Sequence, residues 1–578
     1  MISWIKKYWL EILVFGIVFA ILMIDLNPNF TFMDKAADSI GYTYSALYLY
    51  PSYHTSAPLF LLLGHVFLMI PVATEAWRFG LISVLSTMGA CVFLYLVIKQ
   101  LTAKRILAIL GVLIYGLSAL VISQSIVIET YALVCFLAIG AYYFAINKKW
   151  KLMAVMLGLG LAIHLLAFIV AFIMFLFFKE FRKNWKAVLI MCAFLLFYLY
   201  IPLTNRPPYM WLPNPAEKNS VISFISDTAS VITMLIGTIS VWDLPKRIFD
   251  TIGIVGLSIS VITVIPLFYY LRENKKKLVY LALFWLAVAP IVLFISELDM
   301  NTFDYTMVAM PFLTIMICLG MNIIIDKKWG KKLLYATFAI VICLGIYNAW
   351  YFDIGTNLDK NMSASEYYYT ELAKVPDYSI VMPNDGWDWE TLYLYNREFD
   401  KHLYPICEDI LPSVTYQQTL EKDGIKLIPN TDPNLSIQSK EMAKSIIALN
   451  DNVWTTIEID PSTFGVEVVN ANHDTSLVPA LNMALIQQND THPTWKWIPD
   501  SPYSIYTTSI FITKWSYVIM SKYNLRLFLV IFAIVYALMI FIPKLGRRKN
   551  VAKDSGDSLS STAKNIPPET KDNGTKAL

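Results

Sequence analysis

Ionisable residues recur at one end of successive apolar segments, where a charge is costly unless it has a partner or a function. Seven of them are predicted to lie at the same interface: Asp34, Asp38, Glu129, His164, Arg206, Asp299 and Asp304. A carboxylate in such a group could take the proton from an acceptor hydroxyl as a general base. An arginine could hold the phosphate of a leaving group. This combination at the edge of a lipid bilayer indicates a reaction on a lipid-linked phosphate.

Each of these residues also has a simpler interpretation. Asp34, Asp38 and Asp299 are compatible with solvated loop acids. Glu129 could complement the dipole at the start of a helix, and His164 could be a packed polar residue that bonds a neighbouring helix. Arg206 could be a headgroup anchor. Both interpretations therefore stay open for these six residues.

Composition requires that these residues be positioned by membrane helices. Of the 578 residues, 57% are hydrophobic and 15% are charged, whereas soluble domains are nearer half apolar and a quarter charged. The formal net charge of +3 is too small to indicate a nucleic-acid partner. The six cysteines include no Cys-x-x-Cys pair, so a zinc or redox site is not indicated.

Long apolar blocks predict ten membrane spans. They cover residues 8–26, 79–98, 105–125, 129–146, 187–203, 251–270, 278–296, 305–325, 332–351 and 524–543. The block from Leu152 to Phe178 is too long for one upright helix and too short for two, and basic clusters flank both ends. We therefore expect two short half-helices that meet near His164 at the outer face. The run from Pro58 to Val72 is expected to be re-entrant or to lie on the outer surface.

Lysine and arginine residues are concentrated in the loops that this arrangement places inside the cell. The bias predicts a multi-pass protein with both termini in the cytoplasm, in the plasma membrane if the source is a prokaryote. Four regions follow: a membrane domain over 1–351, an extracytoplasmic α/β domain over 352–522, a final transmembrane helix over 523–545 and a disordered cytoplasmic tail over 546–578.

The α/β assignment of the outer region depends on a short pattern of elements. The stretch 366–374 is typical of a helix, and Tyr378–Met382 is typical of a buried strand. An acidic loop follows, with Asp385, Asp388 and Glu390. These acids could bind a cation or a sugar, and a solvated acidic loop is the simpler interpretation.

Several motifs occur in a fixed order along the chain. The first are Asp38-Ser39-Ile40-Gly41-Tyr42, His54-Thr55-Ser56-Ala57-Pro58 and Ala76-Trp77-Arg78. Then follow Ser123-Gln124-Ser125 with Glu129-Thr130-Tyr131, Gly158 to His164, and Tyr198 to Leu203 with Arg206. The last is Val381 to Trp389, which includes Asp385, with Leu392-Tyr393. The ordered set resembles a membrane family, long labelled a domain of unknown function, that is related to protein O-mannosyltransferases. The chain departs from the family pattern at Gly41, where the family has glutamate, and at Thr55 and Ser56, where it has prolines. The family arginine near Asp304 is also missing.

The resemblance implies the C-type glycosyltransferase (GT-C) fold, an α-helical polytopic membrane protein with about 11–12 membrane helices, short half-helices included. In that superfamily a first-loop aspartate is the catalytic base, and the donor is a sugar on a polyprenyl phosphate. Asp38 would be the base, with Asp34 as its alternative. Residues for the donor or its phosphate would be Arg206, His164 and Glu129. Acceptor-binding or supporting residues would be His54, Arg78, Asp304 and Asp385.

The sequence thus predicts a membrane glycosyltransferase that moves a hexose, with mannose as one candidate, from a polyprenyl-phosphate donor to an extracytoplasmic protein or glycan acceptor. Membrane lipid is the other expected partner. No redox cofactor is required, and a divalent cation is compatible with the motifs without being required by them. One alternative is a transporter or flippase for a lipid-linked glycan, which would need polar residues at mid-membrane and broken helices in repeated halves. The other is a non-catalytic scaffold whose outer domain binds glycan or peptide, which loss of the motif glutamate favours.

Overall fold

The computed structural model describes part of the chain: residues 2–28, 37–49, 57–164, 166–199, 269–270, 277–294, 303–327, 329–350, 373, 375–382, 388–406, 411, 414–430, 432, 435–450 and 453–455. Four predicted segments lie outside these residues, apart from 269–270 and 373. They are the helix at 366–374, the spans at 251–270 and 524–543, and the tail over 546–578.

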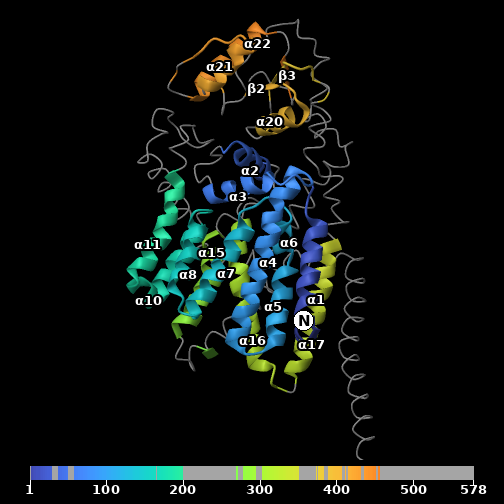
Figure 1. Cartoon of the computed structure of the whole chain (residues 1–578), viewed down its shortest axis with the longest axis vertical. Coiled ribbons are helices and arrows are strands. Elements are labelled where there is room, and N and C mark those ends of the chain that lie inside the picture. Colours follow the sequence, from blue (N-terminus) through green and yellow to red (C-terminus); the bar gives the residue numbers. More distant parts are fainter. Residues whose placement is uncertain are drawn as a thin grey trace, which may run out of the picture.

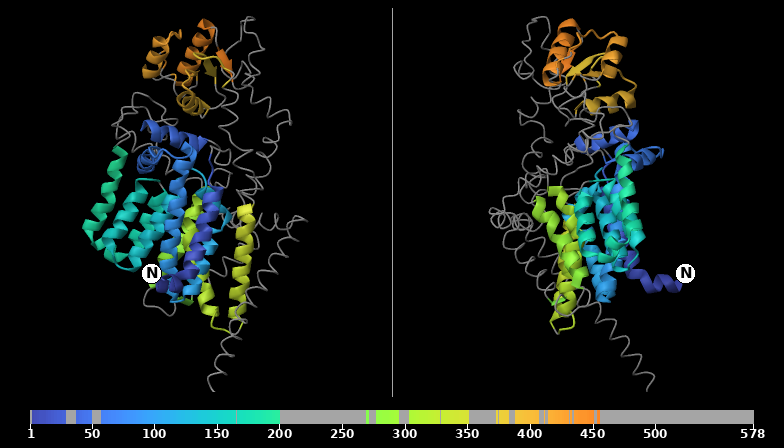
Figure 2. Two further views of the ribbon diagram at one scale, coloured as in Figure 1. Left: turned by 45° about the vertical axis from the view of Figure 1, so that its right-hand side comes forward. Right: turned by 90° about the vertical axis from the view of Figure 1, so that its left-hand side faces the viewer.

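The described membrane helices stand side by side in a bundle (Figure 1 and Figure 2). The long ones are α1 (Ile2–Asp25), α4 (Glu75–Thr102), α7 (Tyr131–Ile146), α15 (Lys277–Phe294), α16 (Met310–Ile324), which the 3-10 helix η4 (Phe303–Ala309) precedes, and α17 (Gly330–Trp350). Four helical stretches in the described residues are long and apolar enough to cross a membrane, or five if one bent pair counts as a span. This is the helical polytopic membrane protein that the apolar blocks predict.

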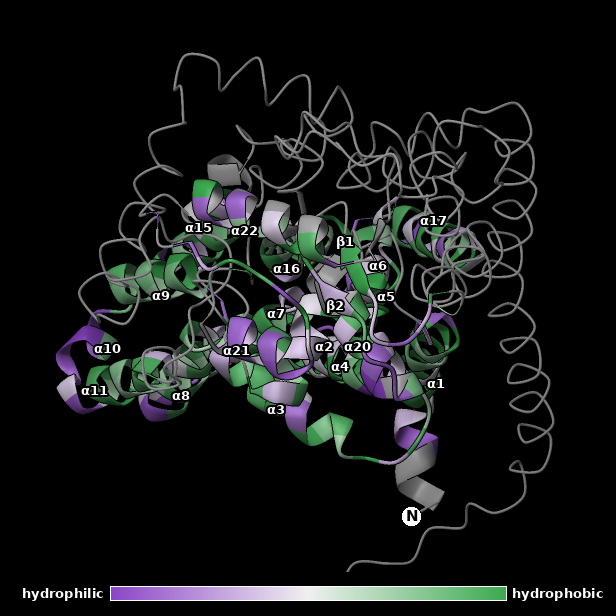
Figure 3. Ribbon diagram, turned by 90° about the horizontal axis from the view of Figure 1, so that it is seen from above, coloured by the Kyte–Doolittle hydropathy of each residue, from purple (hydrophilic) through white to green (hydrophobic). Residues whose placement is uncertain are grey.

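Polar and apolar residues are distributed among the helices as expected for a protein in a lipid bilayer. Viewed from above, α16 and the short helix α9 (Leu166–Phe177) are mostly apolar, whereas α10 (Lys179–Lys183) is strongly hydrophilic (Figure 3). Helix α11 (Trp185–Ala193) and the 3-10 helix η2 (Phe194–Leu199) complete this edge of the bundle.

Two half-helices replace a single span where the sequence predicts them. Helices α8 (Trp150–Leu161) and α9 have 12 residues each. At 1.5 Å per residue each is about 18 Å long, well short of the roughly 30 Å hydrocarbon core. The turn between them contains His164, so the prediction of a broken pair at this residue is confirmed.

The predicted span at 105–125 is wrong in one respect, because it is bent. Helix α5 (Arg105–Gly116) and helix α6 (Ala119–Ser125) meet at an angle of 63°. The break leaves backbone carbonyls without helical partners, and one of them, on Leu117, accepts a hydrogen bond of 2.7 Å from the Asn348 side chain. Such a side-chain partner makes a broken helix tolerable at membrane depth.

A buried charge joins α1 to α4 and α5. Glu11 of α1 is 7% exposed, and its carboxylate accepts hydrogen bonds from the guanidinium of Arg105. The Tyr95 hydroxyl donates to the same carboxylate at 2.7 Å. Because a lone carboxylate would be expensive in a bundle helix, these partners explain why a glutamate is tolerated there.

Two short helices, α2 (Ala37–Tyr48) and α3 (Pro58–Leu68), lie across one end of the bundle (Figure 1). With 11 residues, α3 is about 16 Å long and does not span, in agreement with the surface or re-entrant helix expected at Pro58–Val72. Gly64 lets α3 lie directly on α4, since a Cβ built there would stand 2.3 Å from Cζ of Phe79.

The C-terminal described elements form an α/β unit, residues 375–455. Strands β1 (Ile380–Met382), β2 (Tyr404–Pro405) and β3 (Val453–Thr455) make a parallel sheet in the order β2-β1-β3. Its helices are α20 (Asp388–Phe399), α21 (Val414–Lys422) and α22 (Leu435–Leu449).

Alternation along β1 separates the helices of the α/β unit into two layers. Ile380 packs in one apolar cluster with residues of α21 and α22, whereas Val381 packs in another with residues of α20. Successive side chains of a strand point to opposite faces of the sheet. The helix α20 therefore covers the face toward the bundle, and it lies next to α2 (Figure 1).

Candidate functional site

Helix α2 carries the predicted base at its first turn, because Asp38 is its second residue. The next residue, Ser39, is buried, and its hydroxyl donates a hydrogen bond of 3.3 Å to the carbonyl of Ile128. The start of α2 is thereby held against the segment 126–130 that connects α6 to α7. This contact places the backbone of Asp38 close to that of Glu129.

Glu129 is 4% exposed and lies in the same connecting segment. Its carbonyl accepts a hydrogen bond of 3.2 Å from the Ser83 hydroxyl of α4, and its carboxylate accepts one of 3.1 Å from the backbone N–H of Thr130. Just before it, the hydroxyls of Ser125 and Thr87 are 2.6 Å apart. Polar side chains of α4 thus hold the segment in place.

His164 lies in the turn between α8 and α9. Its Nδ1 accepts a hydrogen bond of 3.1 Å from the backbone N–H of Leu166. In the neutral ring the proton is then on Nε2, which leaves that atom as a donor. Burial lowers the pKa of His164 to about 4, so the ring is neutral near pH 7.

Two tyrosines complete an aromatic triangle with His164. The ring centroids of Tyr131 and Tyr305 are 5.5 Å and 5.9 Å from that of His164, and 5.7 Å from each other. Tyr131 opens α7 two residues after Glu129, and Tyr305 follows Asp304 in η4. The triangle therefore joins three separate segments, each of which carries a predicted site residue.

Backbone contacts bring two further segments to the same place. The N–H of Leu59, at the start of α3, donates to the carbonyl of Ala162 at 3.1 Å. The Tyr198 hydroxyl of η2 donates to the carbonyl of Leu161 at 2.9 Å. The start of α3 and the 3-10 helix η2 thus lie at this end of the bundle.

Four of the predicted residues are therefore brought to one end of the bundle: Asp38, Glu129, His164 and Asp304. For Asp38 and Asp304 this holds for the backbone alone. Four others, Asp34, His54, Arg206 and Asp385, lie outside the described residues.

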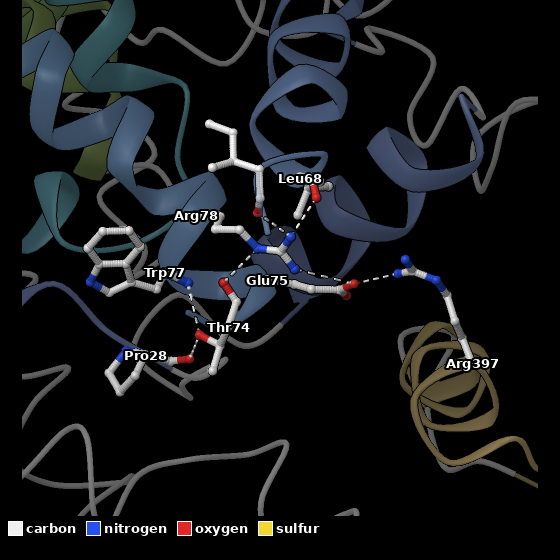
Figure 4. A network of polar contacts seen from close by, with 8 residues as sticks. Pro28, Leu68, Thr74, Glu75, Trp77, Arg78 and Arg397 are labelled. Atoms are coloured by element: carbon white, nitrogen blue, oxygen red, sulfur yellow. Dashed lines mark hydrogen bonds and ion pairs between the residues drawn. The ribbon is translucent and has the colours of Figure 1, made fainter. Parts of the chain in front are cut away.

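Arg78 has a different surrounding from the rest of the site. Its guanidinium donates hydrogen bonds to the carbonyls of Leu68 at 2.6 Å, Ile70 at 2.7 Å and Thr74 at 3.2 Å (Figure 4). A cation on the last carbonyls of a helix stabilises its C-terminus. Arg78 thus fixes the end of α3 on the start of α4, which is a supporting role.

Sequence reasoning missed the residues that connect the segments. Ser39, Ser83 and Tyr305 carry contacts across the bundle, and no spacing of residue types marks them. Ser39 and Tyr131 stand in two of the ordered motifs, so membership of a motif was the one available signal for these two residues. Within the described part of the chain, no three His, Cys, Asp or Glu side chains gather in a way that could hold a metal ion.

The solved structures that are similar to this chain include two crystal structures of one protein. The crystal structure of ArnT from Cupriavidus metallidurans bound to undecaprenyl phosphate is 10% identical, with a TM-score of 0.45 over 72% of this chain and 88% of that chain. Its apo form is 9% identical, with a TM-score of 0.46 over 76% and 89%. Both TM-scores are too low to establish a shared fold. No curated protein matches the chain.

A family model gives a firmer result for the part of the chain that contains most of the site. The matched residues, 38–186, run from Asp38 through Glu129 and His164 to the start of α11. This segment matches the model of the Protein O-mannosyl-transferase TMEM260 N-terminal domain, which confirms over these residues the family resemblance that the sequence motifs indicate.

Proposed function

We propose that the chain is a membrane glycosyltransferase of the GT-C type. It moves a hexose, with mannose as the first candidate, from a polyprenyl-phosphate donor to a protein or glycan acceptor. The observation that carries the proposal is that Asp38, Glu129 and His164 come to one end of the bundle within the segment that matches an O-mannosyltransferase domain.

The proposed reaction is a single displacement at the anomeric carbon. The Asp38 carboxylate takes the proton of the acceptor hydroxyl, and the hydroxyl oxygen forms a bond to the anomeric carbon. The bond from that carbon to the phosphate oxygen breaks, and the polyprenyl phosphate leaves with the electron pair. Arg206 pairs with the phosphate as its charge develops.

His164 and Glu129 act on position rather than on the bond that breaks. The Nε2–H of the neutral His164 ring is a hydrogen-bond donor for a donor or acceptor oxygen. Glu129 lies in the connecting segment, which the Ile128 carbonyl joins to α2 and the Glu129 carbonyl joins to α4. Asp34 is the alternative base, since it is the other aspartate of the first loop, four residues before Asp38 in the sequence.

We propose that this end of the bundle faces the extracytoplasmic side, together with the α/β unit. Helix α4 starts beside the site at Glu75 and carries Lys99 near its other end, where Lys104 pairs with Asp326 at 2.7 Å. Cations gather at the end away from the site, which the positive-inside rule assigns to the cytoplasm. The N-terminus lies in the half of the bundle away from the α/β unit (Figure 2).

One observation favours the transporter alternative. The bent α5–α6 pair is a broken helix with Ser123, Gln124 and Ser125 buried in its second half. Broken helices line substrate sites in many transporters. However, the Ser125 hydroxyl bonds Thr87 and the carbonyl of Val121, so this polar group is used within the bundle.

The test is sugar transfer from radiolabelled polyprenyl-phosphate hexoses by membranes that carry the protein or its variants. Asp38→Asn should abolish transfer at equal protein level, because the amide cannot accept the proton. Asp326→Asn is the matched control, since its exposed carboxylate lies away from the site, and it should keep full activity.

Equal transfer by Asp38→Asn would remove that residue from the mechanism, and Asp34→Asn would then be the next variant. Movement of an intact lipid-linked sugar across sealed vesicles, without transfer to any acceptor, would overturn the enzyme proposal in favour of a transporter.

A further inference from the structure

Helix α20 of the α/β unit exchanges apolar side chains with the membrane helices. Leu394 of α20 is 3% exposed and belongs to the core cluster of the bundle. In return, Tyr44 of α2 packs against one of the two apolar clusters of the α/β unit, the one that contains Ile380. Each part thus contributes a side chain to the other's interior, so the two are docked rather than simply tethered.

An aromatic contact lies at the centre of this interface. The rings of Tyr44 and Tyr393 have centroids 5.5 Å apart with an interplanar angle of 49°. Tyr44 also contacts Tyr48, one turn further along α2, at 4.9 Å. The second half of α2 is therefore the part that α20 holds.

Three charged side chains interact at the edge of this interface. Arg397, in the last turn of α20, places Nη1 2.5 Å from Oε1 of Glu75 at the start of α4 (Figure 4). The same carboxylate oxygen is 3.8 Å from Nη2 of Arg78. Because Arg78 also binds the final carbonyls of α3, Arg397 is connected to the ends of both helices that support α2.

Helix α2 is held at two places that differ in function. Its first turn, with Asp38, is tied to the site through Ser39 and Ile128. Tyr44 is six residues beyond Asp38, about 9 Å along the helix axis. A short helix held at both ends transmits a displacement of one end to the other, since its backbone hydrogen bonds keep it rigid.

We propose that α20 holds α2, and with it Asp38, in the working position, and that Arg397 and Tyr393 are positioning residues that act through Glu75 and Tyr44. The inference rests on the proposed function, in which Asp38 is the base. It gives the α/β unit a part in the transfer step in addition to any acceptor selection.

The first experiment tests the docking by itself. Glu75→Cys and Arg397→Cys are combined in a Cys192→Ser, Cys407→Ser background and treated with a short bifunctional maleimide in membranes. Mass spectrometry should find a cross-linked peptide pair joining positions 75 and 397. Absence of this pair, while each single-cysteine protein reacts with the reagent, would overturn the docked arrangement.

The second experiment reports on α2. Ser45 is fully buried in α2 and its hydroxyl has no hydrogen-bond partner among the described residues, so Ser45→Cys loses no bond that the structure describes. In the same background, Arg397→Glu should raise the labelling rate of this cysteine by an impermeant maleimide by about fivefold, the change expected for an exposed pair of this kind. The charge swap Glu75→Arg with Arg397→Glu should restore the low rate.

Transfer assays then connect α2 to Asp38. Arg397→Glu should lower kcat by a similar factor while KM for the polyprenyl-phosphate donor stays within about twofold. The charge swap should restore kcat. Lys422→Glu, the same charge change at an exposed site on α21, is the control and should alter neither labelling nor kcat.

Unchanged labelling and unchanged kcat in Arg397→Glu would overturn the positioning role. A change in labelling with no change in kcat would also overturn it, since α2 would then move without consequence for the base. If the parent protein transfers no sugar from any donor, the proposed function fails, and the cross-link and labelling results still decide whether α20 holds α2.

Discussion

Substitution of Gly64 by alanine tests how closely α3 must lie on α4. A Cβ at this position would meet Phe79 at 2.3 Å from Cζ, 2.6 Å from Cε2 and 2.7 Å from Cε1. Ordinary contacts between carbon atoms are about 3.5–4.0 Å, so the new Cβ and the Phe79 ring must separate by roughly 1 Å or more. Phe79 is fully buried, and Phe60 lies against it with ring centroids 4.9 Å apart. The ring has no space to retreat, so α3 itself must move.

The expected cost follows from these contacts. Overpacking of a well-filled core costs about 1–3 kcal/mol. Alanine is the better helix former by up to about 1 kcal/mol, which offsets part of that cost. We therefore expect Gly64→Ala to destabilise the protein by about 1–2 kcal/mol. Transfer activity should fall as well, because the start of α3 is bonded to Ala162 beside His164.

Thermal unfolding in detergent and sugar transfer in membranes are the two measurements. Gly16→Ala on α1 is the matched control, since a Cβ there meets no atom of the described residues within 4 Å, and it should be neutral or slightly stabilising. Phe79→Leu, combined with Gly64→Ala, should recover part of the loss, giving a non-additive pair. A Gly64→Ala protein as stable and active as the Gly16→Ala control would refute the close seating of α3.

Three further predictions concern single contacts. Arg78→Lys should lower the unfolding temperature, because a point charge cannot satisfy the three carbonyls that the guanidinium fork reaches; unfolding of the variant in detergent checks this. Glu11→Gln should cost about 1–3 kcal/mol by leaving Arg105 poorly paired, and Glu11→Gln with Arg105→Gln should cost less than Arg105→Gln and Glu11→Gln added together. In the folded protein the pKa of His164 is below its ordinary value of 6.5, so the free energy of unfolding falls as the pH is lowered from about 6.5 to about 4. The His164→Gln variant should lose this component of the acid sensitivity, which unfolding measured against pH checks.

Much of the helical layout could be predicted because it depends on local properties of the chain. The Leu152–Phe178 block is too long for one span and too short for two, and the structure has two half-helices with His164 in the turn. The run after Pro58 is likewise short, and α3 does not span. These outcomes depend on the length of each apolar segment compared with the thickness of the bilayer, and that length can be counted along a sequence.

The bend within 105–125 could not be predicted in this way. From Ile106 to Leu117 every residue is apolar or aromatic, and Gly116 does not by itself distinguish a bend from a straight span, because glycine is frequent in membrane helices. The bend is stable because Asn348, which is 231 residues away, supplies a hydrogen bond to the Leu117 carbonyl. A partner so distant in sequence is set by packing and leaves no local pattern.

The candidate site likewise has features that follow from local sequence and features that follow only from packing. The sequence by itself predicted that Asp38, Glu129, His164 and Asp304 lie near helix ends and close to one another, since an unpaired charge is costly in the hydrocarbon and apolar length is local. Only the tertiary structure decided that Ser39 bonds Ile128 across 89 residues, that His164 lies between Tyr131 and Tyr305, and that Arg397 reaches Glu75. Those contacts depend on how helices pack in three dimensions, because bonds between segments far apart in the chain are formed only when the whole bundle is assembled.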